Sequence, residues 1–351
     1  MRRLRGVLTG SSVSNENLTK STTMEPAAPP ARAKAERQRR SAQLLQDYSI
    51  LAFLVALFVG LALTSDVFLT VRNLRNLVDQ SVAVGLIACA GGLIIMGGGF
   101  DLAAGSIYLL SAIIAAKVSN LLGAGPGILA GLLAGVLLGG VNALVCTVGK
   151  INSFVGTLAT SIFFAGLATA ISGGGFTYID DQGFAILSAN LFGINISILL
   201  FAAFALLSAF LLNRTVWGCY LLAVGDNAEA AKLSGVSVNR TLAIGYMLSG
   251  FSAGLAGVIV ASRSLAVSSS SGVANNVIFS ALAAILVGGV SMRGGEGSIW
   301  RILAGVFILA LVSNGFNLNG IDPLYQQMLS GVLILAAVTV DIWVKSPGGG
   351  D

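Results

Sequence analysis

Asp101 is the first candidate for chemistry, because it is a carboxylate set in a glycine-rich break between two apolar runs. On insertion scales an ionised Asp within a membrane costs about 2.5–3.5 kcal/mol, so its side chain must face protein, water or a partner. Two roles fit this residue. It caps the N-terminus of the following helix, where its charge suits the helix dipole, or it lines a polar pathway and accepts hydrogen bonds from a polyol. The cap is the favoured interpretation.

Hydroxyl and amide side chains near this break are further candidates for a pathway. Ser106 follows Asp101 within the break, and Asn152 precedes an apolar run that carries Thr157 and Thr160. Such groups can bind the hydroxyls of a sugar, but Ser and Thr also hydrogen-bond backbone carbonyls within membrane helices. For any one of them the structural role is favoured. The hypothetical translocation residues are therefore Asp101, Ser106, Asn152, Thr157 and Thr160.

The sequence contains few residues that could form a catalytic site. The sequence has no histidine, which removes Ser-His-Asp catalysis, histidine metal sites and histidine proton relays. Its three cysteines stand singly, without a Cys-x-x-Cys pair. The Gly149-Lys150 pair is followed by Ile151 and lacks the upstream glycine of a phosphate-binding loop. We expect no catalytic residue, metal or cofactor here, and an ATPase that drives this protein must be a separate chain.

The composition indicates that lipid is the solvent for most of the surface. Hydrophobic residues make up 55% of the 351 residues and charged residues only 10%, against about 25% charged in an average soluble domain. A water-soluble globule could not cover its surface with so few charges. We therefore predict an all-α, polytopic integral membrane protein.

Basic residues gather at the N-terminus. Nine of the 20 Lys and Arg residues lie in the first forty positions, a pattern typical of a cytoplasmic arm under the positive-inside rule. We predict a disordered arm over residues 1–44 that contacts anionic membrane lipid. Because the net charge of +5 is not spread over a folded face, nucleic acid is not an expected partner.

Apolar runs of about 20 residues, enough to cross a ~30 Å hydrocarbon core, alternate with short polar links. With the N-terminus inside, cytoplasmic segments hold sixteen basic residues, nine in the arm and seven elsewhere, and the outside holds four. Both termini are thus predicted to be cytoplasmic, with a membrane domain over residues 45–344 and a short tail over 345–351. The ten predicted spans are 48–65, 80–98, 102–122, 126–148, 154–172, 194–212, 241–262, 276–290, 298–316 and 323–343.

Glycines recur every four residues in two of these spans. Residues four apart share one helix face, so each series forms a groove in which a neighbouring backbone can lie close. The spacing predicts helix association and carries no information on function. The residues concerned are Gly127, Gly131 and Gly135 in one span and Gly250 and Gly254 in another.

The longest internal cytoplasmic segment, residues 213–240, contains a short predicted helix. Asp226 or Asn227 can cap its start, and Gly235 can end it. Small alanines would let the helix seat in a cleft of a soluble partner, and an ordinary amphipathic loop helix with a solvated charge pair is an equal alternative. The candidate docking residues are Asp226, Asn227, Glu229, Ala230, Ala231, Lys232, Ser234 and Gly235.

Taken together, these segments resemble the ribose-type permease subunits of bacterial ABC importers from about residue 45 to 343. Each motif alone is weak, but all occur in the right order. They are Gly98-Gly99-Phe100-Asp101-Leu102 with Gly105-Ser106, Ser153-Phe154-Val155-Gly156-Thr157-Leu158, Ala223-Val224-Gly225-Asp226-Asn227 through Ala230-Ala231-Lys232-Leu233-Ser234-Gly235, Leu286-Val287-Gly288-Gly289, Gly294-Gly295-Glu296-Gly297-Ser298 and Asn314-Gly315-Phe316-Asn317-Leu318.

The resemblance implies a permease of the bacterial inner membrane that pairs with a second copy or a paralogue. It further implies an ABC ATPase subunit docked from the cytoplasm and a periplasmic sugar-binding protein that delivers a monosaccharide of the ribose, xylose or galactose type. Residues 226–235 would then be the coupling helix that fits into the ATPase. The sequence departs from the family pattern at Ala103-Ala104, where a Ser-Val type of pair is usual, and this weakens transfer of substrate identity.

Three alternatives remain open. A branched-chain amino-acid or nucleoside ABC permease has a related pattern. An ion-coupled secondary transporter would need several intramembrane carboxylates or a histidine, and Asp101 stands nearly alone. A membrane-embedded enzyme would need a clustered acid, base or metal set, so it ranks last.

Overall fold

The computed structural model describes residues 49–191 and 193–322, together with positions 325, 328, 331, 332, 335 and 339. The predicted arm over residues 1–44 and the tail over 345–351 lie outside the described residues. So does most of the tenth predicted span, residues 323–343.

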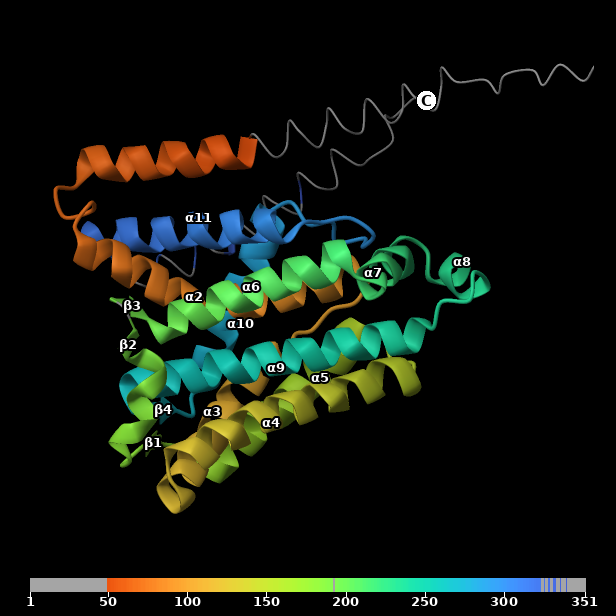
Figure 1. Ribbon diagram of the computed structural model, residues 1–351, viewed down its shortest axis with the longest axis horizontal. Helices are drawn as coiled ribbons and strands as arrows, with labels where there is room; N and C mark the ends of the chain where they lie inside the picture. The colour runs from red at the N-terminus through yellow and green to blue at the C-terminus, as the bar shows by residue number, and fades with distance from the viewer. Residues whose placement is uncertain are drawn as a thin grey trace, which may run out of the picture. The chain divides into compact units, whose positions relative to one another are not determined.

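The described chain is almost entirely helical (Figure 1). An apolar helix over Ser49–Thr64 comes first. The elements that follow are α2 (Val71–Met96), α3 (Ala104–Leu122), α4 (Ala124–Ala143), the π-helical turn η1 (Leu144–Val148), α5 (Ser153–Ser172), the 3-10 helix η2 (Gln182–Ser188), α6 (Ile196–Arg214), α7 (Val216–Asp226), α8 (Ala228–Leu233), α9 (Val238–Ser264), α10 (Ser271–Val287) and α11 (Ile299–Leu318).

Short strands join the links at one end of the helices. β1 (Phe176–Tyr178) pairs antiparallel with β4 (Ala266–Ser268), with Thr177 opposite Val267. β2 (Asn190–Leu191) and β3 (Ile194–Asn195) form a hairpin just before α6. These strands tie the α5–α6 link to the α9–α10 link, and the predicted all-α class is confirmed for the membrane part.

In the described part of the chain, 7 helices are long and apolar enough to cross a membrane. They are α2, α3, α4 with η1, α5, α6, α9 and α11. The helix over Ser49–Thr64 and α10 are shorter apolar helices within the described residues. The predicted polytopic membrane architecture is confirmed, but the count of ten spans is not.

Helix α2 begins nine residues before the predicted span at 80, and two polar residues of this early part, Asn73 and Asp79, are buried within the protein. Thr70 caps the helix by accepting a hydrogen bond from the Asn73 N–H at 3.3 Å. The Asn73 and Asn314 side-chain amides donate to each other at 3.1 and 2.8 Å, which joins α2 to α11. A hydropathy profile assigns such polar residues to a link between spans. Side-chain amides that hydrogen-bond to each other can nevertheless lie within membrane helices.

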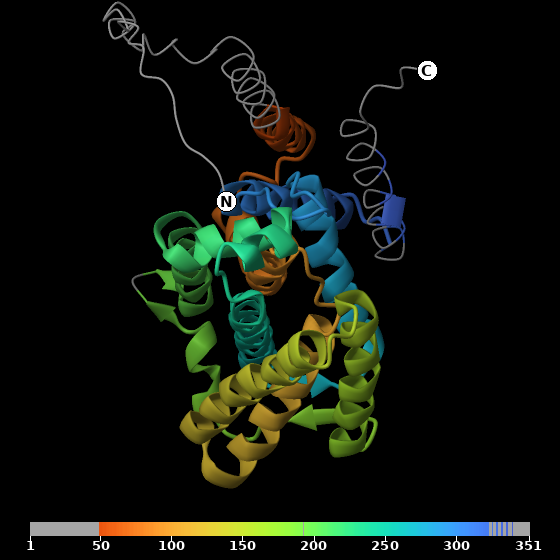
Figure 2. The same cartoon turned by 90° about the vertical axis from the view of Figure 1, so that its right-hand side faces the viewer.

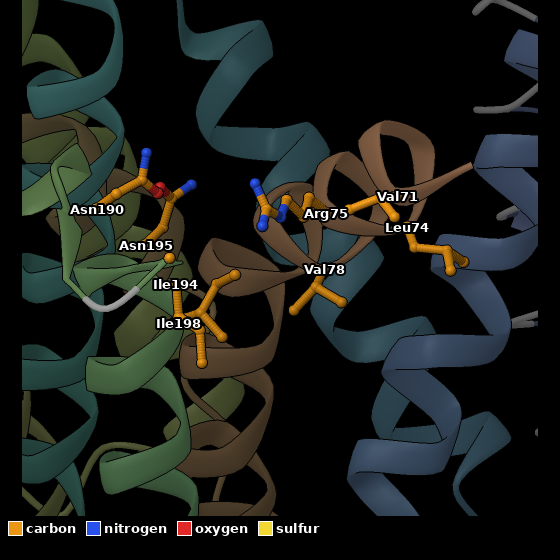
Figure 3. Close-up of a pocket in the computed structure, with 9 residues that line it drawn as sticks. Val71, Leu74, Arg75, Val78, Asn190, Ile194, Asn195 and Ile198 are labelled. Carbon is orange, nitrogen blue, oxygen red and sulfur yellow. The ribbon is translucent and has the colours of Figure 1, made fainter. Parts of the chain in front are cut away.

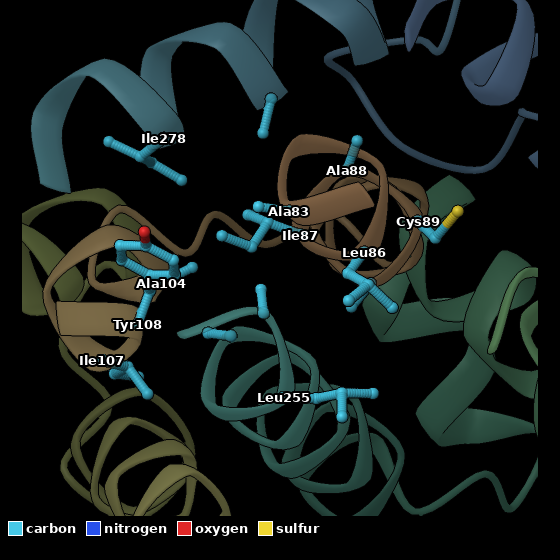
Figure 4. Close-up of a cluster of buried hydrophobic side chains, with 14 of the residues drawn as sticks. Ala83, Leu86, Ile87, Ala88, Cys89, Ala104, Ile107, Tyr108, Leu255 and Ile278 are labelled. Atoms are coloured by element: carbon cyan, nitrogen blue, oxygen red, sulfur yellow. The ribbon is translucent and has the colours of Figure 1, made fainter. Parts of the chain in front are cut away.

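The core lies where α2, α3 and α9 meet, and these three are the most buried of the spanning helices. Figure 2 shows α9, in teal, among the other helices. In Figure 4 the buried side chains Ile87 of α2, Tyr108 of α3 and Ile278 of α10 point into the space between these helices. Helices α4, α5 and α6 expose most of their apolar surface, as lipid-facing helices do.

Glycines bring the backbones of α4 and α9 into direct contact. A Cβ added to Gly135 of α4 would lie 2.5 Å from the carbonyl oxygen of Gly250 and 2.9 Å from the Cα of Gly254, both in α9. Gly127 and Gly131 of α4 face α3 in the same way, with the Ala115 carbonyl oxygen and the Ala115 Cβ respectively at 2.7 and 2.8 Å. The glycines spaced four residues apart therefore lie at two helix–helix contacts. Larger side chains at these positions would hold the helices apart.

We expect Gly135→Ala to lower the free energy of unfolding by about 1–3 kcal/mol, because the added methyl group overpacks a backbone contact. Gly140→Ala is the matched control in the same helix, since no heavy atom lies within 4 Å of its added Cβ. This control should be neutral or stabilising by up to about 1 kcal/mol. Unfolding titrations of the detergent-solubilised chain test both variants, and equal stabilities would show that the contact is not tight.

Candidate functional site

The link between α2 and α3, residues 97–103, is non-helical backbone among spanning helices. Backbone polar groups at membrane depth must find partners within the protein. The first three N–H groups bond back to α2: Gly97 donates to Leu93 O at 3.0 Å, Gly98 to Ile95 O at 2.9 Å and Gly99 to Ile94 O at 3.0 Å. Gly98 has φ +79°, a left-handed conformation that ends the helix.

Side chains from two other helices satisfy the rest of the link. The Phe100 N–H donates to Ser153 Oγ and the Leu102 N–H to Thr157 Oγ1, both at 3.1 Å, so α5 holds one side. Tyr246 of α9 donates its hydroxyl to the Phe100 carbonyl oxygen at 3.2 Å. The link is thus fixed by segments more than fifty residues away in sequence.

Asp101 is buried at the centre of this link, with only 6% of its surface exposed. Its Oδ1 accepts hydrogen bonds from the Ala103 N–H and from Asn142 Nδ2, each at 3.1 Å. Its Oδ2 accepts a hydrogen bond from Ser249 Oγ at 2.7 Å. One carboxylate therefore joins the start of α3, the end of α4 and the middle of α9.

The hydrogen bonds continue from Asn142 into α5. Thr160 Oγ1 donates to Asn142 Oδ1 at 2.6 Å, and Asn142 is completely buried. Asn142 lies two residues before the π-helical turn η1, and such turns often mark functional positions in helices. Ser106 and Ser161 share a further hydrogen bond of 2.8 Å between α3 and α5.

The structure brings four of the five hypothetical translocation residues together. Asp101, Ser106 and Thr157 are buried and Thr160 is half-buried, and all four hydrogen-bond to other protein groups. Asn152 is exposed and caps α5, accepting from the Phe154 N–H at 3.0 Å. As they stand, these groups form a scaffold, and their part in translocation stays a prediction.

Sequence reasoning missed the partners of this scaffold, namely Asn142, Ser153, Tyr246 and Ser249. A polar residue inside an apolar span was the available signal for Asn142 and Ser249. Within the residues that the structure describes, no group of three or more His, Cys, Asp or Glu side chains could hold a metal ion.

A second feature is the short helix α8, which Figure 1 shows at one end of the helices, beyond α7 and α9. Asn227, not Asp226, caps it: Asn227 Oδ1 accepts from the Glu229 N–H at 3.1 Å and from the Ala230 N–H at 2.9 Å. Asp226 is the last residue of α7. Gly235, with φ +86°, follows the end of α8, as a left-handed glycine commonly does.

One side of α8 packs inward and the other is presented to the surroundings. Ala231 is buried, whereas Glu229, Ala230 and Lys232 are exposed. Leu233 is 90% exposed, which makes it an apolar side chain with almost no contact to the described chain. Sequence reasoning passed over Leu233, although a leucine in a polar cytoplasmic segment was a usable signal.

Glycines connect α8 to the link that holds Asp101. Gly225, two residues before the cap of α8, approaches so closely that a Cβ added to Gly98 would lie 3.5 Å from the Gly225 Cα. A Cβ on Gly294 would lie 2.8 Å from the Gly225 carbonyl oxygen. The Gly295 N–H also donates to the Met96 carbonyl oxygen at 2.8 Å. Backbone contacts thus join the segment before α8 to the end of α2 and to the α10–α11 link.

Comparison with known proteins places this geometry in context. Residues 73–338 match the family described as "Branched-chain amino acid transport system / permease component". No solved structure matches the chain.

Three similar proteins are sugar permeases by name. The chain is 37% identical to the L-arabinose transport system permease protein AraH of Escherichia coli over 301 residues, covering 85% of this chain and 91% of the relative. It is 31% identical to the ribose import permease protein RbsC of Escherichia coli over 306 residues, covering 86% and 94%. It is 31% identical to the fructose import permease protein FrcC of Rhizobium meliloti over 296 residues, covering 79% and 80%.

Removing the carboxylate of Asp101 should destabilise the protein. We expect Asp101→Ala to lower the free energy of unfolding by about 2–4 kcal/mol, because Asn142, Ser249 and the Ala103 N–H each lose a buried acceptor. Asp101→Asn keeps one oxygen and should lose about half as much. Asn152→Ala, at an exposed cap, should cost about 1 kcal/mol. If Asp101→Asn abolished transport while stability stayed unchanged, the carboxylate would act on the substrate instead of on the scaffold.

Proposed function

The chain belongs to this family of transport-system permease components, and on that premise we propose that it imports a monosaccharide across the bacterial inner membrane as the spanning subunit of an ATP-driven, binding-protein-dependent transporter. The single observation that carries the substrate class is the set of named relatives, whose names specify L-arabinose, ribose and fructose. The chain extends over 91% and 94% of the first two.

The charges in the spans support a neutral substrate. Among the described residues, the buried carboxylates are Asp79 and Asp101, and both accept hydrogen bonds from neighbouring protein side chains. A branched-chain amino acid would bring an ammonium and a carboxylate into the pathway, and each would need a free counter-charge or a helix terminus. A sugar requires only neutral donors and acceptors, which Asn142, Thr160 and Ser161 can supply if the scaffold opens.

Coupling to ATP hydrolysis is assigned in this proposal to α8 and its flanks. Asn227 and Gly235 set the two ends of the helix, and Ala231 anchors it to the permease. Glu229, Ala230, Lys232 and Leu233 present a small mixed surface to a cleft in the ATPase. The full coupling set is Asp226, Asn227, Glu229, Ala230, Ala231, Lys232, Leu233, Ser234 and Gly235.

Conformational coupling would run from α8 to the membrane through Gly225. Closure of the ATPase would move α8, and the contacts of Gly225 with Gly98 and Gly294 would carry this movement to the α2–α3 and α10–α11 links. The link at Asp101 connects to α4, α5 and α9, so its rearrangement would change the separation of these helices. This is a shift of packed helices rather than a hinge in one loop.

The remaining partners follow from membership of the family. The permease acts with an ABC ATPase on a separate chain, a periplasmic sugar-binding protein, and a second permease copy or a paralogue. The chain itself holds no catalytic residue and no cofactor in this proposal. Its basic arm over residues 1–44 lies on the cytoplasmic side and contacts membrane lipid.

Two substitutions that change the charge of α8 test the coupling assignment. Glu229→Arg and Leu233→Asp should each reduce co-purification of an ATPase with phosphate-binding-loop motifs by about tenfold, since loss of one interface contact typically costs more than 1 kcal/mol at a hot spot. Asp180→Arg is the matched control, because Asp180 is an exposed carboxylate in the α5–α6 link and not in α8. The measurement is the amount of ATPase recovered with the affinity-purified permease in mild detergent.

Recovery of the permease without any ATPase, under conditions in which an established importer complex stays intact, would contradict the proposed function. Secondary transport would then become the leading explanation. If the ATPase is recovered equally with Glu229→Arg, Leu233→Asp and Asp180→Arg, the importer assignment stands. In that case α8 is not its coupling helix.

A further inference from the structure

An amphipathic groove lies beside the first turns of α2, far from α8 in the fold. Its volume is about 310 Å³, and it opens between α2, the β2–β3 hairpin and the start of α6 (Figure 3). Most of its wall is aliphatic. The residues that line it are Val71, Leu74, Arg75, Val78, Asn190, Gly193, Ile194, Asn195 and Ile198.

The polar groups of this groove lie at its opening. Figure 3 shows the Arg75 guanidinium and the Asn190 and Asn195 amides on opposite sides of the opening, directed toward one another across it, and Val78 and Ile198 farther along the wall. Arg75 is exposed, and no hydrogen bond or ion pair to any described residue holds it. Its charge is therefore free to meet an anion.

The neighbouring carboxylate does not neutralise Arg75. Asp79 is buried, with Asn195 Nδ2 donating to its Oδ2 and Ser197 Oγ to its Oδ1 at 3.3 Å. The Asp79 backbone carbonyl oxygen accepts a further hydrogen bond from Arg263 Nη1 at 3.0 Å. Asp79 thus belongs to the wall behind the groove, and the rim carries positive charge.

The position of Arg75 along α2 fits the polar surface of a bilayer. Helix α2 has 26 residues, so it is about 39 Å long at ~1.5 Å per residue, against a hydrocarbon core of about 30 Å. This excess length is enough for the first turns, which include Arg75, to reach headgroup level. Leu74 and Val78 also line a second groove of about 420 Å³, whose walls are wholly aliphatic or aromatic and include Phe58 and Phe307.

We propose that this groove binds one glycerophospholipid, with its anionic headgroup on Arg75 and an acyl chain along Val78, Ile194 and Ile198. The planar guanidinium binds phosphate oxygens in pairs, and the Asn190 amide supplies a further donor. The second groove, across the ridge formed by Leu74 and Val78, takes the other acyl chain. A monosaccharide fits less well, because its ring hydroxyls would face aliphatic walls without partners.

The test titrates the detergent-purified chain with phosphatidylglycerol and measures the lipid-bound fraction by native mass spectrometry. Arg75→Gln should weaken binding about fivefold, the change that loss of one basic residue near an anionic membrane surface produces. Arg72→Gln is the matched control, since Arg72 is exposed in the same turn but does not line the groove, and it should bind as the wild type does. Both variants should unfold at the wild-type temperature.

Two additional ligands test whether the phosphate or the acyl chains of the lipid account for the effect of Arg75. Diacylglycerol, which lacks the phosphate, should bind the wild type and Arg75→Gln equally, and excess inorganic phosphate should leave lipid binding unchanged. Equal phosphatidylglycerol binding by Arg75→Gln, Arg72→Gln and the wild type would overturn the proposal. Displacement of the lipid by inorganic phosphate, or a loss of diacylglycerol binding as large as that of phosphatidylglycerol, would overturn it too.

Discussion

Backbone N–H and C=O groups at membrane depth must find hydrogen-bond partners within the protein. This constraint is strongest at the link between α2 and α3. Seven residues leave helical geometry there, and lipid offers their N–H and C=O groups no partner. Ser153, Thr157 and Tyr246 supply the missing hydrogen bonds to Phe100 and Leu102. Asp101 then orders the start of α3 and draws α4 and α9 to the same point. The break is stable only because three other helices support it, so the positions of those helices are tied to it.

The same link also lies against the segment that leads into α8 at the surface. Gly225 lies against Gly98 and Gly294, and α8 begins three residues later. Glycine is required where backbones approach so closely, and the close approach leaves no flexible side chain to absorb a displacement. The Gly135–Gly250 contact between α4 and α9 follows the same principle. In the proposed mechanism, movements of α8 would reach the hydrogen bonds of Asp101 through these contacts.

Sequence patterns predicted the features that depend on local composition. Hydropathy located most of the spans, although the count of ten is not confirmed. Asp101 was expected to cap the following helix, but Ala103 takes the N-cap position, and Asp101 accepts a hydrogen bond from the Ala103 N–H. The four-residue spacing of Gly127, Gly131 and Gly135 indicated a contact face but not which helix would meet it. The partners of Asp101 could not be found, because Asn142 and Ser249 lie 41 and 148 residues away. The early start of α2 was missed because the partners of its buried polar residues, Asn314 for Asn73 and Asn195 for Asp79, are far away in the sequence.

Transport by cells lacking the gene for this chain is the most direct measurement, comparing uptake of radiolabelled L-arabinose, D-ribose, D-fructose, D-xylose, D-galactose and L-leucine before and after complementation. A monosaccharide permease coupled through α8 predicts that uptake of at least one sugar is lost on deletion. The wild-type gene should restore it, and the Glu229→Arg gene should not. Loss of leucine uptake with all five sugars unaffected would contradict a monosaccharide as the substrate.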